Sequence, residues 1–254
     1  MAFSASTVIC ARTDWSRVVP GGHGGHQGYL SAVRNRNRSK RRNAHEPDDS
    51  ELAKVTTMLH YDEATLVRDL ARMSIKFRVA FAASCAERLF PAYEAFSSRA
   101  GRGDRVLGAI LEQVWQHLLG DEMSTEQIRL ALSRCMALIP GEDDEPWLNE
   151  QAYADDAASA IAYTLRALEN GEPQDAAWAA RRAYEAADHH VIYRLGIEGE
   201  AQVLAHPIVQ AEFSRQRRDL EELLRARQDS AELFIRLRDR ARTEAPAFFT
   251  LGSR

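Results

Sequence analysis

Cysteine is scarce in this chain, which holds only Cys10, Cys85 and Cys135, with no Cys-x-x-Cys pair. An odd, sparse set of this kind excludes a disulfide framework and gives no signature of a zinc site. Cys85 and Cys135 lie among alanine, leucine and methionine, where a free cysteine behaves as a small hydrophobic residue. We therefore expect buried thiols in a reducing compartment.

Long apolar runs are missing as well. The longest stretches, such as Val79–Ala86, end at charged residues and fall short of the roughly 18 apolar residues that a membrane-spanning helix needs. Residues 1–19 lack the basic start and the sustained apolar segment of a secretory signal. These absences predict a cytoplasmic protein without a membrane partner.

What the sequence does have is an uneven distribution of charge on the two sides of Met58. Residues 1–57 hold nine Lys and Arg against five Asp and Glu, whereas residues 58–254 hold 24 against 32. The net charge of −4 therefore averages two unlike segments. The second segment alone is long enough for one domain with a hydrophobic core.

The segment before Met58 has little structural signal. Residues 20–28 are too rich in glycine for a helix, and residues 34–42 carry six positive charges in nine positions. The basic run could neutralise nucleic-acid phosphates, but it holds no aromatic residue to stack on bases, so we do not favour nucleic-acid binding. The simpler hypotheses are a disordered extension over 1–57 or a mis-assigned start, with Met58 as the true one.

After Met58 the pattern is helical throughout. Apolar residues recur every three or four positions, glycine is scarce, and no segment alternates with the period of a strand. This predicts a compact all-α bundle of about seven helices over 58–254, with Pro91 breaking or kinking the second one. The expected helices are 62–72, 74–89, 104–120, 124–139, 148–169, 173–195 and a long C-terminal helix, 207–242.

Individual residues indicate where these helices begin and how they pack. Asp62 and Asp104 are N-cap types, and Ser124 with Gln127 fits a capping box. The alanine-rich helices 148–169 and 173–195 are expected to form an antiparallel pair, since small side chains let helix axes approach closely. The long last helix has apolar residues near heptad spacing. They are Val209, Phe213, Leu220, Leu224, Ala231 and Phe234.

Signatures of catalysis are missing from the sequence. There is no Gly-x-Ser-x-Gly elbow, and Glu185, Asp188 and His189 on one turn do not form the Glu-x-x-His motif of helical di-iron sites. We therefore assign no catalytic residue, cofactor or metal ligand. The sequence leaves open whether the protein is an enzyme, and favours a non-enzymatic role.

One short stretch combines charged residues with a proline and an aromatic residue. Glu87 and Arg88 precede Pro91 and Tyr93, so a charged pair sits beside a helix-breaking residue and an aromatic ring. These residues are predicted to form either a structural clamp or part of a pocket, and both alternatives stay open.

The same stretch, Cys85–Tyr93, resembles the YjaG-like family of bacterial proteins, whose members carry a Cys-x-Glu-Arg, aromatic, Pro, x, Tyr segment. The resemblance continues along most of 58–254 through an ordered set of short motifs. They are Gly103-Asp104, Trp115, Ile139-Pro140, Asp156-Ala157, Asn170-Gly171-Glu172 and His206-Pro207. The resemblance implies a compact all-α cytosolic domain without an established activity. It also adds Asp156 to the speculative clamp or pocket residues.

Three functions follow from these patterns. The first is a helical interaction module that binds an unknown protein partner or dimerises through an exposed stripe of the long C-terminal helix. The second is a small-ligand or enzymatic pocket near Glu87, Arg88 and Tyr93. The third is nucleic-acid binding through the basic N-terminal run.

Overall fold

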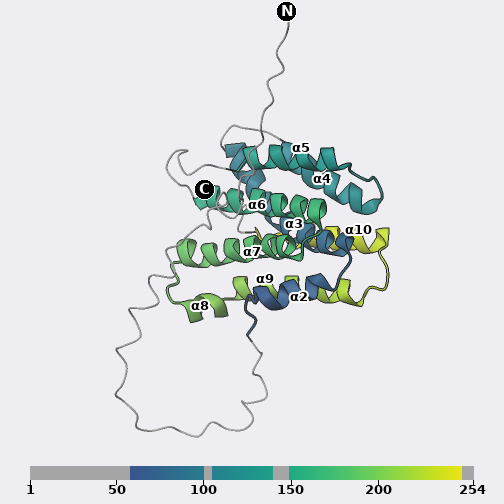
Figure 1. Ribbon diagram of the computed structural model, residues 1–254. Coiled ribbons are helices and arrows are strands. Elements are labelled where there is room, and N and C mark those ends of the chain that lie inside the picture. The colour runs from purple at the N-terminus through teal and green to yellow at the C-terminus, as the bar shows by residue number, and fades with distance from the viewer. Residues whose placement is uncertain (1–57, 100–104, 140–148, 248–254) are drawn as a thin grey trace, which may run out of the picture. The chain divides into compact units, whose positions relative to one another are not determined.

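The computed structural model describes residues 58–99, 105–139 and 149–247, which form nine α-helices and one π-helix (Figure 1). Within these ranges the chain contains no strand, so the all-α prediction is confirmed. The predictions for residues 1–57 lie outside the described residues. None of the described helices has both the length and the apolar character that crossing a bilayer requires.

Helix α3 (Ile75–Arg99) is the centre of the domain. Its residues from Val79 to Leu89 are all buried, which is typical of a helix covered on every side. Five helices pack against it. They are α4 (Val106–Leu119), α6 (Asn149–Asn170), α7 (Pro173–His189), α9 (Pro207–Arg225) and α10 (Ala231–Thr243).

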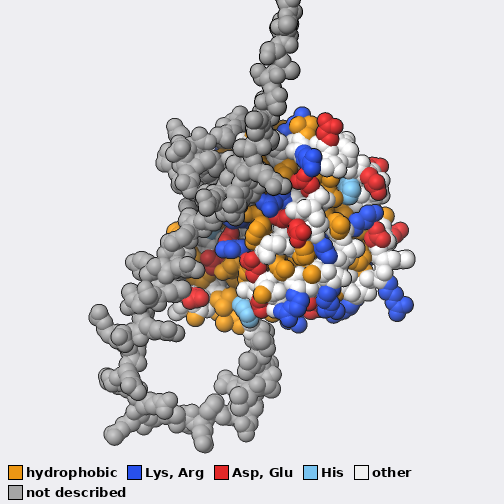
Figure 2. All heavy atoms as spheres, in the orientation of Figure 1, with side chains coloured by type: hydrophobic (Ala, Val, Ile, Leu, Met, Phe, Trp, Pro, Cys, Tyr) orange, Lys and Arg blue, Asp and Glu red, His pale blue; other side chains and the backbone are white. Residues whose placement is uncertain are grey.

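The remaining elements lie around this centre. Helix α5 (Thr125–Ala137) lies beside α4 and α6, α2 (Glu63–Ala71) packs on α7, and the short α8 (Glu200–Ala205) packs on α9 (Figure 1). The π-helix His190–Arg194 extends α7. Acidic and basic side chains are interspersed over the face drawn in Figure 2, as expected of a solvated helical surface.

Several predicted helix ends are confirmed. Asp62 caps α2 by accepting from Thr65 N, and the Ser124–Gln127 capping box opens α5. Pro173 starts α7, and the predicted alanine pair α6–α7 packs together. Asp104, the predicted cap of α4, lies outside the described residues.

Of the two outcomes predicted for Pro91, a break or a kink, the break does not occur: α3 continues through Pro91 to Arg99. The kink stays a prediction. An internal proline costs about 3 kcal/mol because it removes a backbone donor and crowds the preceding turn. Burial of the preceding residues Val79–Leu89, and of Ala92 and Tyr93, offsets that local cost, since most helical stability in proteins comes from tertiary contacts.

The single long C-terminal helix is also wrong, and the helix count is therefore higher than seven. The chain leaves the helix at Ala226, and Ser230 begins α10 by accepting from Leu233 N. The turn lets Phe234 and Leu237 enter the core, where Phe234 packs edge-on against Phe77. The short α8 was not predicted either.

Candidate ligand-binding site beside Arg88

A half-enclosed cavity of about 310 Å³ lies between α3, α7, α9 and the segment that follows α10. Its walls are largely apolar, and its polar groups come from Arg88 on α3 and from Glu212 and Arg215 on α9. The apolar wall includes Leu89, Ala183, Ala187, Pro207, Ile208 and Ala211. The cavity therefore combines a small-residue surface with a few charged side chains.

Arg88 joins α3 to α9 through a buried pair of carboxylates. Its side chain is 1% exposed, and it donates to Asp219 Oδ2 at 2.8 Å and to Glu212 Oε1 at 3.0 Å. Glu212 and Asp219 are seven residues apart, which places them on one face of α9. Burial opposes the charged form of Arg88, but these carboxylates raise its pKa above the ordinary value. The guanidinium is therefore held charged and fixed in position.

Glu212 is held from several sides as well. Besides Arg88 it accepts from Gln216 Nε2 at 3.0 Å, and Gln216 also donates to the Ala180 carbonyl of α7 at 2.9 Å. Arg215 lies 3.5 Å from Glu212 Oε2 through Nη1. The polar side of the cavity is thus fixed to three helices, α3, α7 and α9.

These contacts belong to a larger cluster, which we call the arginine network. It continues from Asp219 to Arg240 of α10, at 2.7 Å, and from Glu222 to Arg236 and Arg240. Within the described residues, five guanidinium groups face four carboxylates. The members are Arg88, Arg215, Arg218, Arg236 and Arg240, with Glu212, Asp219, Glu222 and Glu244.

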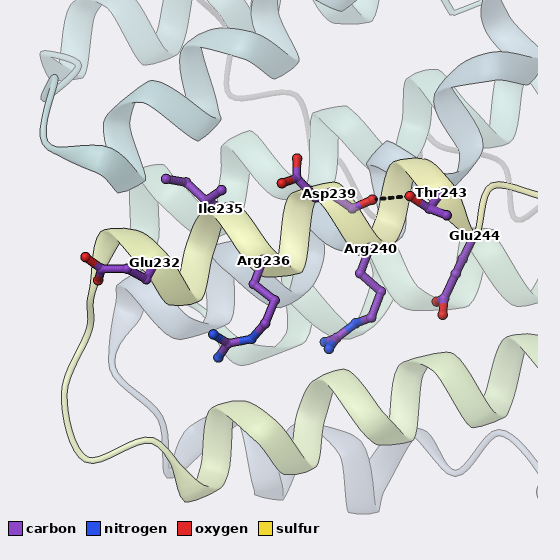
Figure 3. A pocket seen from close by; sticks show the side chains of 7 residues that line it. All are labelled: Glu232, Ile235, Arg236, Asp239, Arg240, Thr243 and Glu244. Atoms are coloured by element: carbon purple, nitrogen blue, oxygen red, sulfur yellow. Dashed lines mark hydrogen bonds between the residues drawn. The ribbon is translucent and has the colours of Figure 1, made fainter.

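A wider recess of about 530 Å³ lies along α10 on the far side of this network (Figure 3). Figure 3 shows Arg236, Arg240 and Glu244 pointing from α10 toward the neighbouring helix, where the two arginines pair with Glu222 of α9. Ile235 is 47% exposed at its edge. Because the recess is open to solvent and these charges are paired across the helices, we do not take it as the candidate site.

Glu87 points away from the cavity although it is next to Arg88. It accepts from Trp115 Nε1 of α4 and from Arg242 Nε of α10, both at 2.6 Å. Adjacent helical residues project about 100° apart, so Glu87 and Arg88 reach different neighbours. The Glu87 contacts tie α3 to α4 and α10, as a clamp would.

The other predicted residues also lie away from the cavity. Tyr93 is 3% exposed and Pro91 is half-buried within α3. Asp156 of α6 is 3.4 Å from Arg182 of α7, and burial raises the pKa of Asp156 well above its ordinary value. Of the five predicted residues, Arg88 is the one that borders this cavity.

Sequence reasoning missed the partners of Arg88 on α9. Glu212, Gln216 and Asp219 are spaced by four and three residues, so they share one helix face, and all three are buried. A polar stripe with helical spacing on a helix that also carries Val209 and Phe213 was the available signal.

Residues 65–246 match the family described as "Protein of unknown function (DUF416)". The chain belongs to this family. The resemblance to the YjaG-like family is thereby confirmed. No curated protein matches the chain.

This DUF416 domain is also similar to a solved structure, a DUF416 family protein from Shewanella baltica OS155. The two share 25% sequence identity, with a TM-score of 0.61. The similarity covers 69% of this chain and 92% of the Shewanella chain.

Proposed function

We propose that this DUF416 domain binds a small molecule in the cavity beside Arg88. The observation that carries the proposal is a half-enclosed, mainly apolar cavity in which two polar side chains, Arg88 and Glu212, are already fixed by an ion pair. Small-molecule sites commonly have this composition: apolar walls with a few polar groups that orient the ligand. The function is then ligand recognition by a helical domain, with no catalytic step assigned.

The energetics of Arg88 support this proposal. A buried ion pair is often no more stabilising than apolar residues of similar volume, because both charges must leave water. The arrangement of Arg88, Glu212 and Asp219 is therefore weakly explained by stability alone. A cavity wall whose charged groups are held in place before binding lowers the entropic cost of recognising a ligand.

The interaction hypothesis relied on an exposed stripe of the C-terminal helix, and the apolar residues of that region differ in their exposure. Val209, Phe213 and Phe234 of the predicted stripe are at most 5% exposed, because α9 and α10 fold back onto the same domain. Leu220 and Leu224 are half-buried and Ala231 is exposed, so part of the apolar pattern reaches the surface. Binding of a protein partner and self-association therefore stay predictions. Nucleic-acid binding rests on residues 34–42, which lie outside the described residues, and it stays a prediction as well.

The proposal is tested by filling the cavity. Ala211 is half-buried in the cavity wall, so Ala211→Leu places a longer side chain in the space that a ligand would use. Ala201→Leu on the exposed side of α8 is the matched control. Ligand-observed NMR with a library of small fragments is run on the full-length protein and both variants.

We expect a set of fragments that bind the unmodified protein and the Ala201→Leu control equally well. Ala211→Leu should weaken them by about ten-fold or more, since displaced binding area is lost. The proposal is wrong if no fragment binds the unmodified protein, or if the fragments that bind do so equally well with Ala211→Leu.

A further inference from the structure

We infer that the ligand of this cavity is a small organic carboxylate with a compact apolar tail, and that Arg215 binds its carboxylate. This inference rests on the proposed function and names the chemical class of the ligand. It comes from the state of Arg215, from the charge of the surrounding cluster and from the shape of the apolar wall.

Arg215 is the charged residue of the cavity whose guanidinium makes no hydrogen bond to another described residue. Its two ion pairs are long, 3.5 Å to Glu212 Oε2 and 4.0 Å to Glu244 Oε2, and no hydrogen bond joins it to another described residue. Its side chain is 23% exposed, so it is accessible from the cavity opening. A guanidinium has five N–H donors in a planar fork that fits a carboxylate in bidentate geometry.

Arg88 supports Arg215 rather than competing with it. Its Nη1 and Nη2 groups are occupied by Asp219 and Glu212, whereas its buried Nε has no hydrogen-bond partner among the described residues. Arg88 therefore contributes positive charge and one unused donor at the cavity wall. Arg88 and Gln216 both bind Glu212 Oε1, whereas Arg215 lies 3.5 Å from the other oxygen, Oε2.

The charge around the cavity favours an anion. Two of the three charged residues that line it are arginines, and Glu212 is the third. The whole arginine network has five guanidinium groups and four carboxylates, so it carries one uncompensated positive charge. A bound carboxylate would balance that charge, whereas a bound ammonium group would double the excess. In a partly desolvated site this difference favours the anion strongly.

The apolar wall indicates the size and shape of the apolar part of the ligand. Ala187 and Ala211 offer short side chains, and Leu89, Pro207 and Ile208 offer larger apolar ones. A cavity of about 310 Å³ lies at the lower end of the range of small-molecule sites. It therefore suits a ligand with a compact apolar group, such as a branched or cyclic hydrocarbon.

The test uses three probes that share one apolar shape: 3-methylbutanoate, 3-methylbutylamine and 3-methylbutan-1-ol. Their dissociation constants are measured by NMR titration on the full-length protein and on two variants. Arg215→Gln removes the proposed anion-binding group. Arg217→Gln is the matched control, because Arg217 is 63% exposed on the same helix and pairs with Glu221.

We expect the carboxylate to bind at least about ten-fold more tightly than the alcohol or the amine, as a charge-assisted bidentate contact predicts. Arg215→Gln should reduce the carboxylate to the affinity of the alcohol and leave the alcohol itself unchanged. That unchanged affinity also shows that the variant is folded with its cavity intact. Arg217→Gln should leave all three probes unaffected.

Other outcomes separate the two proposals. Equal binding of alcohol and carboxylate, tightest binding of the amine, or an equal loss of all probes in Arg215→Gln would overturn the anionic ligand while the cavity function stands. The anionic ligand is also overturned, and the cavity function stands, if none of the three probes binds although other fragments do. If nothing binds in either experiment, both proposals are wrong.

Discussion

Two helix interfaces in this domain are built from opposite kinds of side chain. Helices α6 and α7 meet through alanines that are almost fully buried, whereas α9 and α10 meet through arginines and carboxylates. Short side chains allow close approach of helix axes. Long charged ones fill a wider gap and must satisfy each other inside it.

The cavity has an alanine side on α7 and a charged side on α9. Ala183 and Ala187 of α7 face the side of α9 that carries Glu212 and Arg215. Each interface can be tested by a change that suits its chemistry.

The largest effect is expected in the arginine network. Arg88→Met should lower the free energy of unfolding by about 3–5 kcal/mol, because it leaves Glu212 and Asp219 buried with one fewer cation. Urea denaturation of the full-length protein measures this. Arg225→Met, which removes an arginine that is 77% exposed, is the control and should cost about 1 kcal/mol or less. Similar losses for the two variants would show that the buried network does not hold α9 in place.

The alanine interface should respond to added volume. Ala179 of α7 is fully buried, so Ala179→Leu should destabilise the domain by about 1–3 kcal/mol through overpacking. The same measurement on Ala201→Leu, at an exposed position of α8, should give a change within about 0.5 kcal/mol. A tolerated leucine at position 179 would contradict the close packing that distinguishes this interface.

The smallest effect concerns Glu112 of α4, which the Arg238 guanidinium of α10 hydrogen-bonds at the edge of the domain. This contact, with a second from Gln116, lowers the pKa of Glu112 from 4.5 to about 2. The folded-state pKa lies below the unfolded one, so the stabilisation is present above pH 4.5 and is lost as pH falls toward 2. Because Glu112 is 46% exposed, Glu112→Gln should cost only about 0.2–1 kcal/mol at pH 7.

Urea unfolding at pH 7, 5 and 3 checks this pH dependence. The difference between the unmodified protein and Glu112→Gln should shrink as the pH falls through that window. Glu94→Gln, at an exposed position of α3, should show no such trend. A difference that stays constant with pH would mean that the charge of Glu112 does not contribute to stability.

Local signals predicted most of the helices because their causes are local. The Ser124 capping box and the Pro173 start depend on neighbouring residues, so they can be read from the chain. The break before α10 was also encoded locally, since Ser230 caps Leu233 N, but the heptad pattern that runs across it outweighed that signal in the prediction. The predicted break at Pro91 does not occur for the opposite reason: packing against distant helices decides the outcome there.

The candidate site was predicted only in part. Arg88 could be singled out because a charged residue beside Pro91 and Tyr93 in an apolar stretch is unusual. Its partners lie 124 and 131 residues further along the chain, where nothing in the local pattern links them to it. Their burial depends on how α9 packs against α3.

The sequence by itself determined that this domain is all-helical, where most of its helices begin and end, and which family it belongs to, because periodicity, caps and short motifs are properties of neighbouring residues. Only the tertiary structure decided that the C-terminal region folds back as α9 and α10, that α3 runs through Pro91, and that Arg88, Glu212 and Arg215 border one cavity. These features depend on contacts between residues far apart in the chain, whose free energies exceed the local preferences.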